Sequence, residues 1–91
     1  MTELVWDESF KKIYKKWIQK HPELKAQFTK KILLFAEDPF HPSLKTHSLS
    51  GVLKGLWSFR ITYEYRLVFD FVDEKRTQVV LIDIGSHEEV Y

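Results

Sequence analysis

The segment WSFRITYEYRLVF, Trp57–Phe69, is the clearest structural signal in this chain because it contains two strand patterns separated by a short turn. Over residues 57–62, aromatic and aliphatic residues alternate with Ser, Arg and Thr, as they do in a strand that is buried on one face. The alternation resumes over residues 65–72. The segment therefore predicts a β-hairpin whose turn lies near Thr62–Glu64.

A third strand is expected to follow the hairpin. The polar run Asp73–Arg76 predicts a turn, and Val79–Ile84 is apolar on both faces, which is typical of a strand inside a sheet. The three strands should form an antiparallel meander. Near the start of the chain, the short apolar run Leu4–Trp6 predicts a first strand at an edge of the sheet.

Two helices are predicted between the first strand and the hairpin. Asp7 is suited to cap the first helix, which should end near His21–Pro22. Pro22 can open the second helix at its first position, and Asp38–Pro39 ends it. Residues 38–55 predict a loop with one short strand at most. The apolar stripes expected to face the core are Phe10, Ile13, Tyr14, Trp17 and Ile18 in the first helix and Leu24, Phe28, Ile32 and Phe35 in the second.

The element order β-α-α-β-β-β predicts an α+β fold in a single domain over residues 1–91, an antiparallel sheet with two helices packed on one face. The chain is 44% hydrophobic, which is enough to fill one core. The other face of the sheet is then free to hold a concave site.

Composition excludes several classes of protein. The absence of cysteine excludes a disulfide scaffold and a thiol nucleophile. No apolar run approaches the roughly 20 residues of a membrane span, and the first residues do not resemble a secretory signal, so we expect a cytoplasmic protein with no membrane partner. No glycine-rich phosphate loop and no His cluster at metal-ligand spacing is present, so we expect no metal and no small-molecule cofactor.

Charge is unevenly distributed along the chain. Residues 1–54 contain ten lysines and six acidic residues, whereas residues 55–91 contain four basic and seven acidic residues. Such asymmetry can steer a protein toward nucleic acid, although a solvated helix face is the simpler interpretation of the lysines.

Polar residues that a core does not need gather around the predicted meander. Arg60 and Arg66 lie on neighbouring strands, where cross-strand partners are about 5 Å apart, so both guanidinium groups could bind one phosphate. His87 follows the third strand and could close the site from its end. The candidate site residues are Lys45, His47, Lys54, Arg60, Glu64, Arg66, His87 and Tyr91.

This set meets the needs of metal-free RNA cleavage. A base removes the proton from a 2′-hydroxyl, which attacks the adjacent phosphate, and an acid protonates the leaving 5′-oxygen. Histidine can serve as base or acid near neutral pH, and preorganised cations stabilise the charge that develops on the phosphate.

The same residues carry a family resemblance that covers nearly the whole chain. The chain resembles the RelE/ParE superfamily of bacterial toxins from type II toxin–antitoxin pairs. Trp57–Phe69 is most similar to the YoeB branch, whereas Lys45–His47 and Gly85–His87, with the terminal Tyr91, are similar to the YafQ branch. The resemblance implies a ribosome-dependent mRNA endonuclease whose partners are the 70S ribosome, mRNA and a cognate antitoxin protein.

The resemblance also implies roles for single residues. It places Arg66 on the scissile phosphate, His87 as general acid, Tyr91 as an aromatic that stacks on a base, and Arg60 where one branch has arginine and another has histidine. Lys45 and Lys54, as cations around the meander, are further candidate RNA contacts together with Arg60. For the general base, His47, which matches a histidine that helps with proton removal, is the first choice, and Glu64, which matches an acidic position that orients its neighbours, is the second. The YoeB branch has a glutamate base just before the Lys45 region, and this chain has no carboxylate in residues 40–43.

Two other functions remain open. A ParE-like toxin would share the fold but bind DNA gyrase without cleaving nucleic acid, and a decayed toxin would survive as a non-toxic interaction domain. The pair of Arg66 and His87 favours the nuclease, because a binding module does not need a proton donor beside an arginine.

Overall fold

The computed structural model describes all 91 residues of the chain. Eight regular elements follow one another: β1 (Glu3–Val5), α1 (Glu8–Lys20), α2 (Lys25–Glu37), β2 (His47–Ser48), β3 (Trp57–Arg60), β4 (Tyr65–Phe71), β5 (Gln78–Ser86) and α3 (His87–Val90). Short 3₁₀ turns lie at Pro22–Leu24, Pro42–Leu44 and Gly51–Leu53 (η1, η2 and η3). None of the helices is both long and apolar enough to cross a membrane.

The five strands form one mixed sheet in the order β1-β5-β4-β3-β2. The predicted antiparallel meander of β3, β4 and β5 is confirmed, and β5 lies inside the sheet between β4 and β1. The first strand lies at an edge of the sheet, as predicted, and it pairs with β5 in parallel, which makes the sheet mixed. The two helices carry the chain from β1 at one edge of the sheet to β2 at the opposite edge.

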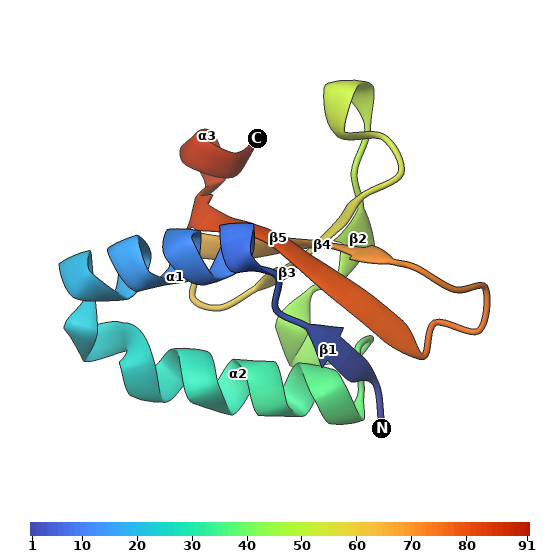
Figure 1. Cartoon of the computed structure of the whole chain (residues 1–91), viewed down its shortest axis with the longest axis horizontal. Coiled ribbons are helices and arrows are strands. Elements are labelled where there is room, and N and C mark those ends of the chain that lie inside the picture. Colours follow the sequence, from blue (N-terminus) through green and yellow to red (C-terminus); the bar gives the residue numbers. More distant parts are fainter.

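The core lies on one face of this sheet. Figure 1 shows α2 beneath the strands and α1 beside β5, with α3 and η3 rising from the opposite face. Phe35 of α2 stacks on Phe59 of β3 and meets Phe69 of β4 edge-on, with ring centroids 4.4 and 4.7 Å apart. Phe10 and Trp17 bring α1 into the same cluster. The prediction of two helices on one face is therefore confirmed.

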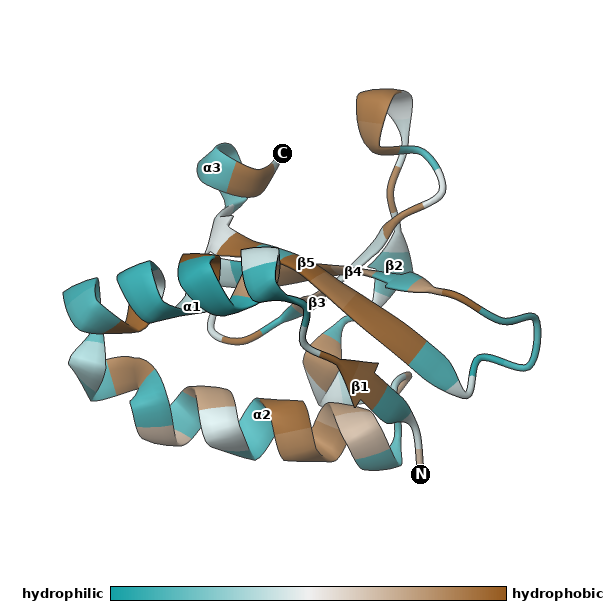
Figure 2. Ribbon diagram, viewed as in Figure 1, coloured by the Kyte–Doolittle hydropathy of each residue, from teal (hydrophilic) through white to brown (hydrophobic).

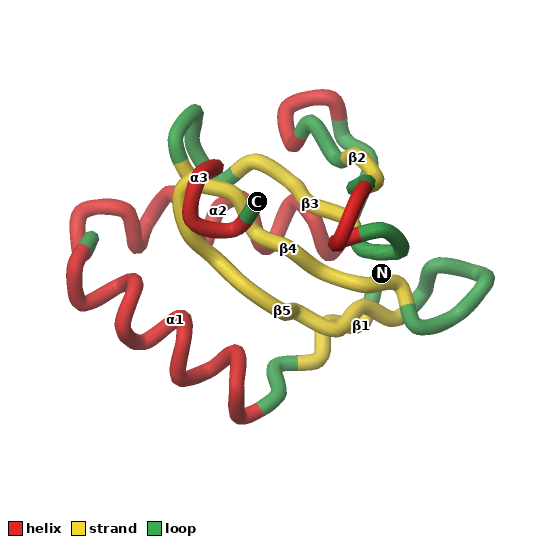
Figure 3. Tube along the Cα trace, turned by 90° about the horizontal axis from the view of Figure 1, so that it is seen from above, coloured by secondary structure: helices red, strands yellow, loops and turns green.

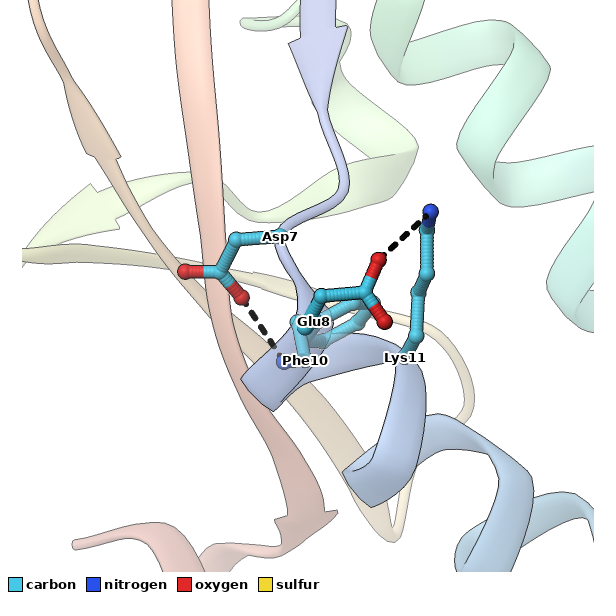
Figure 4. Close-up of polar contacts among 4 residues, drawn as sticks. All are labelled: Asp7, Glu8, Phe10 and Lys11. Atoms are coloured by element: carbon cyan, nitrogen blue, oxygen red, sulfur yellow. Dashed lines mark hydrogen bonds and ion pairs between the residues drawn. The ribbon is translucent and has the colours of Figure 1, made fainter.

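The first helix begins and ends as predicted. The Asp7 carboxylate accepts a hydrogen bond of 2.8 Å from the backbone N–H of Phe10, as Figure 4 shows, and Glu8 pairs with Lys11 on the exposed side. Figure 2 shows α1 mostly hydrophilic on its visible side, whereas α2 and β5 carry long hydrophobic stretches.

The second helix begins later than predicted. Pro22 opens the 3₁₀ turn η1, and α2 starts only at Lys25. The Leu24 N–H bonds to the His21 carbonyl, which is a tight turn geometry rather than an α-helical one. The break lets the chain reverse between the two helices.

The face of the sheet opposite the helices carries two rows of side chains across the strands. Arg60 on β3 faces Arg66 on β4, and Arg66 faces Gly85 on β5. In the neighbouring row, Ser58 lies opposite Val68 and, on its other side, His47 of β2. Because successive residues of a strand alternate in direction, both rows lie on the same face.

Candidate functional site

Two cavities open on the face of the sheet that α2 leaves uncovered, and His87 contributes to the wall of both. The larger has a volume of about 640 Å³ and the smaller about 310 Å³. Arg60, Tyr63, Glu64, Arg66, Ser86, His87 and Glu88 line the larger one, called here the arginine cavity. His47, Ser48, Leu49, Ser50, Val52, Leu53, His87 and Tyr91 line the smaller one, called here the loop cavity.

Arg66 is held in place by the hairpin turn. Its Nη1 donates hydrogen bonds to the carbonyl oxygens of Thr62 and Tyr63, at 3.0 and 2.8 Å. The turn itself is closed by the Thr62 hydroxyl, which accepts from the backbone N–H groups of Glu64 and Tyr65. The guanidinium group is therefore preorganised by the backbone and keeps its full charge, since carbonyl oxygens do not neutralise it.

Arg60 lies directly across from Arg66 in the hairpin register. Its guanidinium carbon is 5.5 Å from the centre of the Tyr63 ring, and its Nε is buried without a hydrogen-bond partner. The only ion pairs in the chain are Lys11 with Glu8 and His21 with Glu23, so neither arginine is paired with a carboxylate. Like charges opposite each other destabilise a sheet, which makes this pair costly unless it binds an anion.

His87 is the first residue of α3, a single helical turn with an ordered start. The Ser86 hydroxyl accepts from the Glu89 N–H, and the Glu89 carboxylate accepts from the Ser86 N–H at 2.9 Å. This reciprocal capping box satisfies backbone donors that such a short helix would otherwise leave open.

Gly85 lets this turn fold back over the sheet. Its φ is not in the left-handed region, so backbone conformation is not the reason for a glycine here. A Cβ at this position would lie 3.2 Å from Val90 Cγ1 and 3.3 Å from Glu89 Cβ. The glycine is required by the close approach of α3, and this brings His87 to the arginine cavity.

Tyr91 and His47 lie on the other side of His87. The ring of Tyr91 meets the ring of His87 edge-on, with centroids 4.4 Å apart, and lies 6.5 Å from the ring of His47. The hydroxyl of Tyr91 is hydrogen-bonded to that of Ser58. His47 Nδ1 donates a hydrogen bond of 2.9 Å to the carbonyl oxygen of Lys45, since a carbonyl oxygen can only accept.

The structure brings six of the eight predicted residues to the two cavities and leaves two apart. Glu64 joins Arg60, Arg66 and His87 at the arginine cavity, and His47 and Tyr91 join His87 at the loop cavity. Lys45 and Lys54 are exposed and line neither cavity. Lys45 ends η2 with a left-handed φ of 53°. It supports the site through its backbone, because its carbonyl oxygen bonds to His47.

Sequence reasoning missed four residues of this region. Tyr63 and Glu88 line the arginine cavity, and Ser58 holds Tyr91. Asp83 follows Val68 in the row that starts at His47, and burial raises the pKa of its carboxyl group. For Ser58 and Asp83 the sequence signal was only an alternation, in which Ser58 shares its side of β3 with Arg60 and Asp83 shares its side of β5 with Gly85. Tyr63 lies in the hairpin turn and Glu88 in α3, where no alternation marks them.

The arrangement can hold an anion between two uncompensated arginines, with a carboxylate and an imidazole beside it. Those groups suit proton transfer at a phosphate ester. No group of three or more His, Asp or Glu side chains is placed to hold a metal ion.

Comparison with known proteins supports the fold and shows the family. Residues 2–91 match the family described as "Bacterial toxin of type II toxin-antitoxin system, YafQ". No curated protein sequence matches the chain. The family match spans the helices, the meander and α3, so it includes every residue of both cavities.

Solved structures of similar shape come from several bacteria. The YoeB/ParE toxin from Agrobacterium tumefaciens is 27% identical over 94% of this chain and 99% of that one, with a TM-score of 0.73. YafQ from E. coli strain BL21(DE3) is 16% identical over 100% and 99%, with a TM-score of 0.77. A metal-bound toxin from Helicobacter pylori is 25% identical over the full length of both chains, with a TM-score of 0.72. With a family match over almost its whole length and the fold of these toxins, the chain belongs to the YafQ family of bacterial toxins from type II toxin–antitoxin systems.

Proposed function

We propose that this toxin is a ribosome-dependent mRNA endonuclease of the cytoplasm, whose substrate is mRNA on the 70S ribosome. One observation carries the proposal: two arginines face each other across β3 and β4 without a carboxylate partner, in the cavity that His87 and Glu64 also line. A backbone phosphate is the anion that suits two planar guanidinium groups.

In the proposed reaction, Arg60 and Arg66 bind the non-bridging oxygens of the scissile phosphate. The general base removes the 2′-hydroxyl proton, O2′ attacks phosphorus, and the P–O5′ bond breaks. His87 gives a proton to O5′, which leaves a 5′-hydroxyl and a 2′,3′-cyclic phosphate. All bond changes take place on the RNA, and the protein supplies only proton transfer and charge.

Glu64 is the base that the geometry favours over His47. Glu64 lines the same cavity as both arginines and His87, whereas His47 lines only the loop cavity. Base and acid must act on the same phosphate, so they are expected in one cavity. In this assignment His47 and Tyr91 contact the nucleotide next to the cleaved bond, with Lys45 and Lys54 at the outer ends of that contact.

The proposal includes an antitoxin that covers or deforms this site. Membership of a type II toxin family implies such a partner. An acidic segment, extended or helical, would meet the unpaired arginines and block the phosphate position. An antitoxin complex that leaves His87 and Arg66 open and in their active geometry would contradict this part.

The experiment that tests the function adds purified toxin to ribosomes programmed with a defined mRNA and reads cleavage by primer extension. Cleavage within the decoding-site codon by the natural chain, and its loss in His87→Gln, would support the nuclease. Binding to DNA gyrase without RNA cleavage would support a ParE-like function instead. If the toxin neither cleaves RNA nor binds DNA gyrase, it is a non-toxic interaction domain.

A further inference from the structure

Ser58 is the only polar residue whose side chain is buried, with an exposed fraction of 0%. It lies on β3 in the row that faces the site, between His47 of β2 and Val68 of β4. A hydroxyl buried in this way destabilises the protein unless it has a hydrogen-bond partner. Its partner is the hydroxyl of Tyr91, 33 residues later and at the end of the chain.

Tyr91 in turn contacts His87 in two ways. Its backbone N–H donates to the His87 carbonyl oxygen at 3.1 Å, and its ring packs edge-on against the imidazole with centroids 4.4 Å apart. A shift of the Tyr91 ring therefore changes the surroundings of the imidazole directly.

A helix of four residues does not hold its shape alone, because helix nucleation is unfavourable. The capping box fixes the start of α3, and Val90 packs over Gly85 in its middle. The Ser58–Tyr91 hydrogen bond fixes its end to the sheet. Figure 3 shows α3 and the chain end lying over the strands, close to β4.

We propose that Ser58 is a positioning residue, which acts through the Tyr91 hydroxyl to fix the imidazole of His87 between the two cavities. This inference rests on the proposed function for its effect on cleavage, but its structural part does not. The inference also distinguishes two roles of Tyr91. Stacking on a base requires only the ring, whereas anchoring α3 requires the hydroxyl group as well.

The test uses Ser58→Ala, Tyr91→Phe and the double variant of the full chain. Each single variant should lower the single-turnover cleavage rate on programmed ribosomes about 5- to 10-fold, the value of one net hydrogen bond. The double variant should be no worse than either single one, because both remove the same contact. The toxin concentration that gives half-maximal rate should not change.

Matched controls remove hydroxyls elsewhere. Ser43→Ala removes a serine hydroxyl that is bonded to a histidine, at 2.9 Å from His41 Nδ1, and Tyr14→Phe removes a tyrosine hydroxyl in the helix layer. Both should cleave like the natural chain. Additive losses for Ser58→Ala and Tyr91→Phe, or natural activity in Tyr91→Phe, would overturn the inference.

A second readout needs no ribosome. In the free toxin, the NMR chemical shifts of the His87 ring and the amide exchange of Val90 and Tyr91 should change equally in both single variants and not in the controls. Unchanged His87 signals with unchanged exchange would overturn the positioning role. If the natural chain does not cleave mRNA, the proposed nuclease fails, and this readout alone decides whether Ser58 positions His87.

Discussion

Replacing Gly85 by alanine should slow cleavage roughly 10-fold or more while leaving the fold almost intact. The added Cβ would lie 3.2 Å from Val90 Cγ1 and 3.3 Å from Glu89 Cβ, closer than ordinary van der Waals contact. The α3 turn must therefore move by a few tenths of an ångström, because β5 on the other side is held in the sheet by β4 and β1. His87 is the first residue to move with α3.

The loss of cleavage rate should be much larger than the loss of stability. Overpacking of this kind costs about 1–3 kcal/mol of stability. Because the crowded atoms lie in α3 at the end of the chain, this cost favours local opening of α3, and the melting temperature of the whole domain should change little. A misplacement of about 1 Å at a catalytic group can reduce a rate about 100-fold, so a smaller shift should reduce cleavage roughly 10-fold or more. The rate is measured by single-turnover cleavage on ribosomes and the stability by thermal unfolding.

Gly55→Ala is the matched control. Gly55 has a φ of 98°, but nothing lies within 4 Å of an added Cβ. It should therefore lose stability through backbone strain, about 1 kcal/mol or more, and retain cleavage at the same temperature. A Gly85→Ala toxin that cleaves normally, or that loses activity only in proportion to its unfolding, would refute the argument that α3 sets the position of His87.

Three further perturbations have defined outcomes. Arg66→Ala should lower cleavage at least about 100-fold with the fold retained in circular dichroism, because removal of one preorganised charge donor costs roughly 2.7–4 kcal/mol in the transition state; unchanged cleavage would remove Arg66 from the site. Arg76→Ala should lower the melting temperature by several degrees, since its guanidinium lies 5.0 to 5.4 Å from the rings of Trp57, Phe40 and Phe71; Arg76→Gly should be less harmful, because a φ of 58° suits glycine, and the reverse order would contradict this. Hydrogen bonds from the Ser86 backbone and side chain hold the pKa of Glu89 below its usual value; this stabilisation is present above the ordinary glutamate pKa and lost as pH falls through the lowered one, so the protection of the capping-box amides, taken relative to the intrinsic exchange rate at each pH, should fall in acid in the natural chain but not in Glu89→Gln.

The sheet could be predicted from the sequence because its signals are local. The alternation in Trp57–Phe69 and the turn at Thr62–Glu64 set the hairpin, and with it the register that places Arg60 opposite Arg66. The direction of β1 and the start of α2 could not be read in this way. A parallel partner 75 residues away leaves no mark on Glu3–Val5, and Pro22 is equally suited to the first turn of a 3₁₀ or an α-helix.

The candidate site could likewise be predicted from the sequence only in part. The charged residues on neighbouring strands were found because strand register brings them together, and His87 was found because it directly follows β5. The contacts that hold the site join residues with no shared pattern, such as Ser58 with Tyr91. A serine in a strand looks like any other polar residue of an alternation until the structure shows that it is buried.

Substitution of Glu64 is the test that best distinguishes a nuclease from a binding module. A pocket that only binds an anion gains nothing from a carboxylate, yet Glu64 and Glu88 line the arginine cavity with Arg60 and Arg66. If Glu64 is the general base, Glu64→Gln should lower the cleavage rate about 100-fold or more, and the toxin should bind a non-cleavable RNA with 2′-methoxy groups more tightly, because a negative charge beside the phosphate is removed.

His47→Gln is the parallel variant, which should weaken RNA binding and spare most of the rate. Binding is followed by fluorescence anisotropy and cleavage by primer extension. Unchanged cleavage in Glu64→Gln together with a large loss in His47→Gln would assign the base to His47, and the phosphate would then have to lie between the two cavities.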